Sequence, residues 1–229
     1  AVAEKNENIW IAQRQGRAKN SNDLTQPAIL KMMAMGGEGS IIDRLKQLHI
    51  VPLTISYEYD PCDYLKAREY QLRRDVPYWK KTAEDDMESM LVGIKGFKGH
   101  IFYRCAPCID EWLDTVDAEQ PKNKLFDEIA AHIDREIHSN YELYPCNYVA
   151  LDMIQDTKVY EEYYTSEDYQ KFDEYINGQI EKIDIENRDD HFLRTCLLTQ
   201  YAYPAKNYIA ASSENGRFKS LLNRLTFKK

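Results

Sequence analysis

The sequence predicts an α/β fold with a partial mixed or parallel sheet, flanking helices and a helical carboxyl-terminal lobe. In the first half, short β-favouring apolar runs alternate with segments of helical character, which is typical of a sheet with helices packed on it. In the second half, apolar residues recur every four positions, at Leu125, Ile129, Ile133 and Ile137. We therefore expect an α/β domain over residues 1–120 and a helical lobe over residues 121–229, packed together in one body.

The first predicted element is a strand at residues 9–12 that leads into a basic turn. Its uninterrupted apolar run is typical of a buried central strand, and Gly16 allows a sharp turn after it. Arg14, Arg17 and Lys19 follow the strand closely. Because ligands of open α/β sheets bind at the carboxyl ends of strands, and guanidinium groups match phosphate oxygens, this turn predicts a phosphate site. The alternative is a solvated basic turn.

The remaining elements follow from capping residues and apolar spacing. Pro27 suits the first turn of a helix, and Ser40 suits the cap of the next one. Met87, Met90 and Leu91 share one face of a later helix. The predicted helices cover residues 27–35, 41–48, 63–74, 80–93, 147–154, 168–185 and 190–203. The predicted strands that follow the first one cover residues 49–59 and 96–104.

Four stretches carry a family resemblance. Residues 10–19 (WIAQRQGRAK) resemble the third sequence block, Phe-Pro-Glu-Gly-Thr-Arg-Ser, of the glycerol-phosphate and lysophosphatidic acid acyltransferase superfamily. Residues 50–56 (IVPLTIS) resemble its fourth block, Val-Pro-x-x-Ile. Residues 20–23 (NSND) and 144–150 (YPCNYVA) are similar to a bacterial branch of that superfamily.

The resemblance implies a site for the phosphate of the acceptor. Gly16 falls on the family glycine, whereas Gln15 replaces the family glutamate and Ala18 stands at the position of the arginine. Arg17 and Lys19, on either side of Ala18, then supply a displaced cationic contact. The substrate phosphate-binding residues implied in this way are Arg14, Gln15, Gly16, Arg17 and Lys19.

The catalytic signature of the superfamily, His-x-x-x-x-Asp, is absent from the sequence. Its histidine acts as general base for the acceptor hydroxyl, and its aspartate orients that base. The residues five positions after the five histidines are Thr54, Cys105, Ile137, Leu143 and Cys196. In the family this signature precedes the third block, so we expect the chain to be the carboxyl-terminal portion of an acyltransferase, with no catalytic residue of its own.

The function implied is transfer of a fatty acyl group from a thioester carrier, acyl-CoA or acyl carrier protein, to a glycerol-phosphate-like acceptor in phospholipid biosynthesis. The carrier is a co-substrate, and no metal or other cofactor is expected. The expected partners are the acyl thioester and a phosphate-bearing lipid precursor. The alternative is a non-catalytic anion-binding or interaction domain of the same fold.

Composition indicates a folded chain that does not seek nucleic acid. The 229 residues carry a net charge of -8 and are 43% hydrophobic. The five cysteines lack a regular spacing, which favours free thiols in a reducing cytosol. Because no apolar run approaches the ~18 residues of a spanning helix, we expect a cytoplasmic protein whose membrane contact is peripheral. An amphipathic pattern over residues 217–229 could supply that contact, although docking on the core is the competing interpretation.

Two further motifs suggest other chemistry. Cys105 and Cys108 form a Cys-x-x-Cys after a predicted strand, where a redox pair can lie, but the surrounding order of elements does not fit the thioredoxin fold. A zinc site built on this pair alone would lack a second pair of ligands. His132 and His138 are six positions apart on one predicted helix, on nearly opposite faces, so they predict structural histidines. The apolar strand at residues 9–12, if left as a sheet edge, predicts self-association.

Overall fold

The computed structural model describes residues 5, 7–16 and 18–214, and these form a mostly helical molecule. Helices account for 56% of the chain and strands for 5%. Within the described residues, the sheet has two strands, β1 (Leu53–Tyr57) and β2 (Ile101–Cys105), which pair antiparallel with Leu53 opposite Cys105. The prediction of an α/β fold with a mixed or parallel sheet is therefore wrong.

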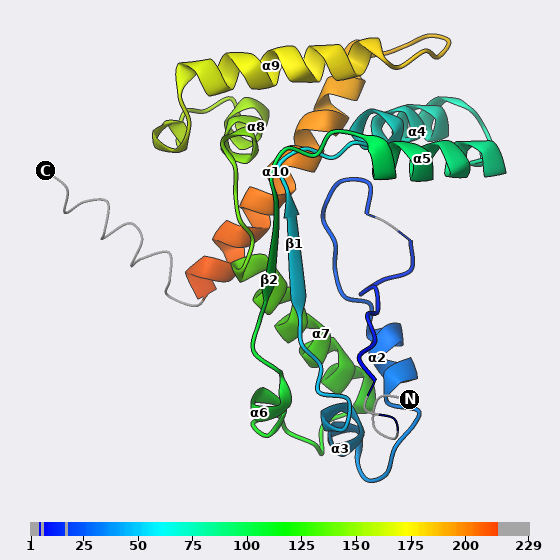
Figure 1. Cartoon of the computed structure of the whole chain (residues 1–229), viewed down its shortest axis with the longest axis vertical. Coiled ribbons are helices and arrows are strands. Elements are labelled where there is room, and N and C mark those ends of the chain that lie inside the picture. Colours follow the sequence, from blue (N-terminus) through cyan, green and yellow to red (C-terminus); the bar gives the residue numbers. More distant parts are fainter. Residues whose placement is uncertain (1–4, 6, 17, 215–229) are drawn as a thin grey trace, which may run out of the picture.

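The antiparallel pairing follows from the connection between the strands. That connection contains two helices, α4 (Asp63–Asp75) and α5 (Ala83–Lys95), which lie side by side at one end of the molecule in Figure 1. One helix carries the chain away from the end of β1 and the other brings it back, so β2 starts where β1 stopped. A parallel pair would have needed a single crossover to the opposite end.

No strand forms over residues 9–12. This segment has no regular secondary structure, and Trp10 is 77% exposed. A strand needs a neighbour to pair its backbone groups, and the described part of the sheet consists of β1 and β2 alone. The prediction of a buried central strand at this place is therefore wrong. Self-association through a sheet edge at this place stays a prediction.

Most other predicted elements are confirmed, with changed ends. Before the sheet lie α2 (Pro27–Met33) and α3 (Ile41–Lys46). After it come a short helix and a series of longer ones, α6 (Asp110–Leu113), α7 (Lys122–Ser139), α8 (Pro145–Gln155), the 3-10 helix η1 (Glu161–Tyr163), α9 (Ser166–Glu181) and α10 (Asp190–Glu214). Capping boxes at Ser40, Thr82 and Thr165 fix the starts of α3, α5 and α9.

Two hydrophobic clusters hold these elements, one on each side of the small sheet along the long axis (Figure 1). The first joins α8, α9 and α10 around Phe172, Ile176 and Leu197, all of which are at most 1% exposed. The second joins α2, α3 and α6 to α7, with Leu45 and Ile129 fully buried. Helix α7 thus shares its core with elements from the first half of the chain. The domain division at residue 120 stays a prediction.

Helix α5 is amphipathic but exposes its apolar face. Met87, Met90, Leu91 and Ile94, spaced as one helical stripe, are each more than half exposed, and Ser89 is the buried residue of the helix. The helix was predicted correctly, whereas the packing that its apolar face suggested is not made by the described residues.

None of the described helices combines the length and apolar composition that a bilayer crossing requires. The predicted amphipathic tail, residues 217–229, lies outside the described residues.

Candidate binding cleft

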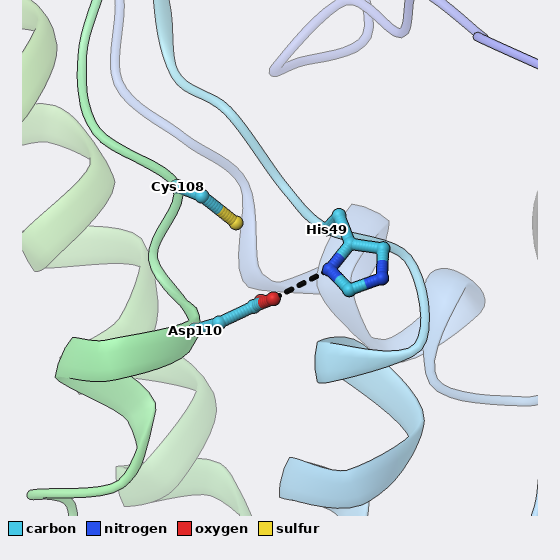
Figure 2. Close-up of side chains that lie close together, drawn as sticks. All are labelled: His49, Cys108 and Asp110. Carbon is cyan, nitrogen blue, oxygen red and sulfur yellow. Dashed lines mark hydrogen bonds and ion pairs between the residues drawn. The ribbon is translucent and has the colours of Figure 1, made fainter.

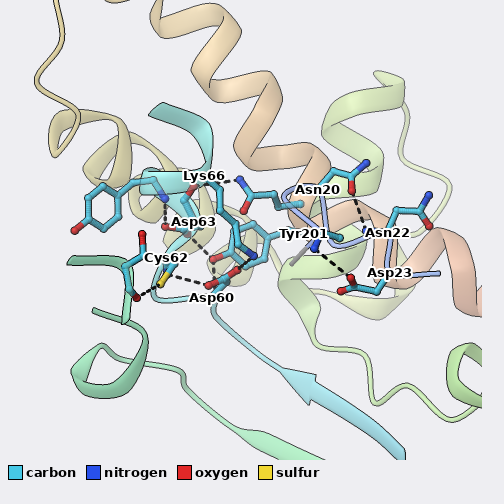
Figure 3. Close-up of polar contacts among 12 residues, drawn as sticks. Asn20, Asn22, Asp23, Asp60, Cys62, Asp63, Lys66 and Tyr201 are labelled. Atoms are coloured by element: carbon cyan, nitrogen blue, oxygen red, sulfur yellow. Dashed lines mark hydrogen bonds and ion pairs between the residues drawn. The ribbon is translucent and has the colours of Figure 1, made fainter. Parts of the chain in front are cut away.

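A cleft of about 390 Å³ lies where β1, the start of α4 and the middle of α10 meet. Its walls combine aromatic, carboxylate, amide and ammonium groups, and Figure 3 shows the polar contacts at its centre. Three chain segments that are distant in sequence supply much of the wall. They are residues 18–23, residues 55–66 and residues 141–147. Gln200, Tyr201 and Pro204 of α10 close the cleft from the remaining side.

Tyr201, which lines the cleft, is hydrogen-bonded to a buried carboxylate. Asp63, the first residue of α4, is fully buried, and its Oδ2 accepts hydrogen bonds from the hydroxyls of Tyr201 (2.6 Å) and Tyr175 (2.7 Å). Burial raises the pKa of Asp63 to about 6, and the two tyrosine hydrogen bonds oppose this rise. The same burial raises the pKa of Tyr201 well above its ordinary value. The network therefore fixes Tyr201, which lines the cleft, in its neutral form.

The charged groups of the wall are mixed in sign. Asp60 pairs with Lys66, and its backbone amide donates to the hydroxyl of Tyr201 at 3.2 Å. Lys98 donates to the carbonyl oxygens of Ile94 and Gly96 and lies within 4 Å of no carboxylate of the described residues. Its ammonium is thus the wall cation that remains available to a ligand anion.

The acids Asp23, Asp60 and Glu142 of the wall outnumber the cations Lys66 and Lys98. The cleft is for this reason not a general anion cradle. It suits a ligand that carries hydroxyl groups for the carboxylates and a single anionic group for Lys98.

The loop at residues 18–26, which supplies Ala18, Ser21 and Asp23 to the cleft wall, is anchored to two helices. The backbone amide and the hydroxyl of Thr25 donate to Asp134 of α7 at 2.8 and 2.6 Å. Asn207 of α10 donates to Asn22 at 3.1 Å. These contacts hold Ser21 and Asp23 in the cleft wall. The shape of the cleft therefore depends on segments more than 100 positions apart.

The predicted phosphate-binding residues that the structure describes lie outside the wall of this cleft. Arg14 lies 3.6 Å from Asp23, whereas Lys19 forms an ion pair with Glu69 on α4. Gln15 is exposed, with its backbone amide donating to Gln26, and Gly16 has a positive φ of 72° with open space around it. Arg17 lies outside the described residues. Their neighbours Ala18, Ser21 and Asp23 line the cleft, while Arg14, Gln15, Gly16 and Lys19 are not among its lining residues.

The predicted structural histidines, His132 and His138, belong to α7. The ring of His132 stacks on Trp112 with centroids 3.8 Å apart, and burial lowers the pKa of His132 to about 4. His138 lies 3.2 Å from the carbonyl oxygen of Asp23, and burial lowers its pKa as well. Both rings therefore stay neutral at pH 7 and serve in packing. No histidine is among the described residues that line the cleft.

The polar residues at the centre of the cleft were not predicted from the sequence. Asp60, Asp63 and Lys66 follow a strand whose end was predicted at residue 59, which is a position where ligand sites recur. That signal was present in the sequence. Tyr175 and Tyr201 meet Asp63 across 112 and 138 positions, and no local pattern marks such pairs.

Comparisons of the chain with protein-family models, curated proteins and solved structures found no match.

Proposed function

We propose that this chain supplies the acceptor-binding cleft for transfer of a fatty acyl group from a thioester carrier to a glycerol-phosphate-like acceptor. One observation supports this best. The stretches that resemble the acyltransferase superfamily lie far apart in the sequence, yet each contributes to the wall of the same cleft. Residues 10–19 contribute Ala18, residues 20–23 contribute Ser21 and Asp23, residues 50–56 contribute Ile55 and Ser56, and residues 144–150 contribute Asn147.

The wall matches the groups of such an acceptor. A glycerol-phosphate carries hydroxyls, which can donate to Asp60 or Asp23, and a phosphate, which Lys98 can pair with. A phosphate that enters beside Asp23 also competes with that carboxylate for Arg14. The guanidinium of Arg14 lies 3.6 Å from the carboxylate of Asp23, which is longer than a hydrogen bond. The basic turn then acts at the rim of the cleft, and Lys98 acts inside it.

The proposal assigns acceptor binding to this chain, but not removal of the hydroxyl proton. The sequence has no His-x-x-x-x-Asp signature, and a positioned base typically contributes ~10² to 10⁴-fold to such a step. Two histidines do have carboxylate partners, His49 with Asp110 and His100 with Glu58, each at 2.6 Å. Neither pair has the family spacing, so we expect no acyl transfer by the chain alone.

A non-catalytic anion-binding or interaction domain is the second candidate. It is favoured by the missing catalytic signature. The two candidates differ in what the cleft selects. An acceptor site should prefer glycerol-3-phosphate to inorganic phosphate, because it contacts the hydroxyls as well, whereas an anion site should bind both equally.

Isothermal titration calorimetry with glycerol-3-phosphate, glycerol and inorganic phosphate tests the proposal. Lys98→Ala should weaken binding of glycerol-3-phosphate by about tenfold or more, as expected for loss of a charge-assisted hydrogen bond. Lys95→Ala is the matched control. It removes an exposed cation from the end of α5, close in sequence to Lys98, and should bind normally. Binding that is absent, or that both variants weaken equally, would contradict the assignment of the cleft.

A further inference from the structure

A second group of polar side chains lies away from the cleft, where the turn after α3 meets the segment before α6. His49 belongs to the turn, Cys108 belongs to the segment, and Asp110 is the first residue of α6. Figure 2 shows the imidazole, the thiol and the carboxylate pointing toward one another. This group is separate from the residues that carry the proposed function.

Backbone pairing brings the two segments together. The amide of Ile109 donates to the carbonyl oxygen of Ile50 at 3.0 Å, which extends the contact of β1 and β2 beyond the ends of the strands. Ile109 is 1% exposed and packs in the cluster around α7. Cys108 and Asp110 flank Ile109 at the start of α6, and both are partly buried. His49 faces them from the paired segment.

The three donor atoms lie within 4.8 Å of one another. Nδ1 of His49 is 2.6 Å from Oδ2 of Asp110. The other carboxylate oxygen, Oδ1 of Asp110, is buried and has no hydrogen-bond partner among the described residues. A buried carboxylate oxygen without a partner is costly, and a cation is one group that would satisfy it.

We propose that His49, Cys108 and Asp110 bind a divalent transition-metal ion of the zinc type. Nitrogen, thiolate and carboxylate ligands together are typical of Zn²⁺, and three protein ligands leave the fourth tetrahedral position open to water or to another ligand. Ligand atoms around tetrahedral zinc lie roughly 3.3 to 3.8 Å apart, so the group needs shifts of about 1 Å. The side chain of His49, which is 75% exposed, is free to make them.

The charges of the site balance. Binding forms one bond from the metal to Nδ1 of His49, one to Sγ of Cys108 and one to a carboxylate oxygen of Asp110. The thiol proton passes to solvent, because the thiolate is the ligand. One thiolate and one carboxylate then neutralise the two positive charges of the ion.

The Cys-x-x-Cys pattern was considered as a redox pair, and the structure separates its two members. Cys105 ends β2, where it is exposed and faces Leu53 in the ladder, whereas Cys108 belongs to the three-residue group. The zinc interpretation had lacked a second pair of ligands. In the structure His49 and Asp110 join Cys108 instead of Cys105, which makes a group of three ligands.

Titration of the reduced, chelator-treated full chain, without an affinity tag, with Co²⁺ tests the proposal. We expect a thiolate-to-cobalt charge-transfer absorption that saturates at one ion per chain and is removed by Zn²⁺. Cys108→Ser should abolish the absorption. His49→Ala and Asp110→Asn should each weaken Co²⁺ binding by about tenfold or more, since loss even of an outer partner of a ligand costs about that much.

Cys105→Ser and His100→Ala are the matched controls, and both should retain the absorption and the affinity of the parent chain. His100 is an exposed histidine that also pairs with a carboxylate. Far-ultraviolet circular dichroism of each variant checks that it is folded. No absorption with the parent chain, its persistence in Cys108→Ser, or its loss in Cys105→Ser would overturn the assignment.

Discussion

Asp63 is the residue on which the centre of the cleft depends. Its carboxyl group is fully buried, and it holds Tyr175 and Tyr201 by two hydrogen bonds. The amide nitrogen of Gln179 is a third, longer contact at 3.4 Å, and Asp60 is the nearby acid that raises the pKa of Asp63 further. No cation pairs with Asp63 among the described residues, so ionisation of its side chain is costly.

The raised pKa makes stability depend on pH. The carboxyl of Asp63 has a pKa of about 6 in the folded chain against 3.8 ordinarily, so the folded chain binds more protons between these values. The free energy of unfolding therefore falls as the pH rises from about 4 to 6, by roughly 3 kcal/mol in total. Asp63→Asn should remove this decline. Between about pH 4 and 6 the parent chain should therefore lose roughly 3 kcal/mol of unfolding free energy that the variant keeps.

Urea unfolding at pH 4, 5, 6 and 7 measures the difference between the two chains. Asp127→Asn, the same change at an exposed position of α7, should run parallel to the parent chain. Equal pH dependence of the parent chain and Asp63→Asn would mean that Asp63 is not the group whose ionisation is suppressed.

At the scale of elements, helix α9 carries Tyr175 to Asp63, and its start is fixed by a capping box. The hydroxyl of Thr165 accepts from the amide of Asp168, whose carboxylate accepts from the amide of Thr165 in return. This pattern satisfies two of the amides that a helix start leaves open.

Thr165→Ala should lower the free energy of unfolding by about 1 kcal/mol, because both the cap and its reciprocal contact are weakened. Urea unfolding at pH 7 measures this loss. Ser166→Ala, at the adjacent exposed position without a capping bond, should change stability far less. A similar loss in both variants would indicate that the capping box does not set the stability of α9.

The elements show what the sequence could and could not predict. Helix α3, with its cap, and α7, with its apolar stripe, were predicted because both signals are local. The direction of β2 was not predicted, because hydrophobic periodicity shows which face of a strand is buried but not which strand it pairs with. The apolar run at residues 9–12 failed as a strand for the same reason, since pairing decides between a strand and an irregular segment.

The candidate sites were likewise predicted only in part. The basic turn was visible as a charge pattern, but the partners Asp23 and Glu69 that engage Arg14 and Lys19 were not. Of the group around Cys108, the sequence showed the Cys-x-x-Cys, whereas His49 is brought to it by pairing of segments that no spacing reveals. Contacts across long sequence separations are what sequence patterns fail to predict here.

At the scale of the whole molecule, the segment at residues 18–26 connects the cleft to α7 and α10. Asp134 is the main anchor, because one of its oxygens accepts from both the amide and the hydroxyl of Thr25. Burial raises the pKa of Asp134, and the two bonds from Thr25 oppose this rise. The cleft wall is thus held in place by a residue outside it.

Asp134→Ala should detach this segment while leaving the two hydrophobic clusters intact. Hydrogen exchange of the amides at residues 18–26 should become about tenfold faster or more, since two hydrogen bonds to a charged group are lost. Asp127→Ala, an exposed change on the same helix, should leave this exchange unaltered. Faster exchange throughout the chain, rather than in this segment, would contradict a local anchoring role.

The proposed acceptor site is one cleft, built from segments far apart in the sequence, that binds a glycerol-phosphate-like molecule. Hydrogen-exchange mass spectrometry of the full chain, with and without saturating glycerol-3-phosphate, measures which segments the ligand protects. We expect slower exchange at residues 18–23, 55–66 and 141–147 together, with α9 and the group around His49 unchanged. Unchanged exchange in these three segments, or slower exchange confined to other surfaces, would contradict it.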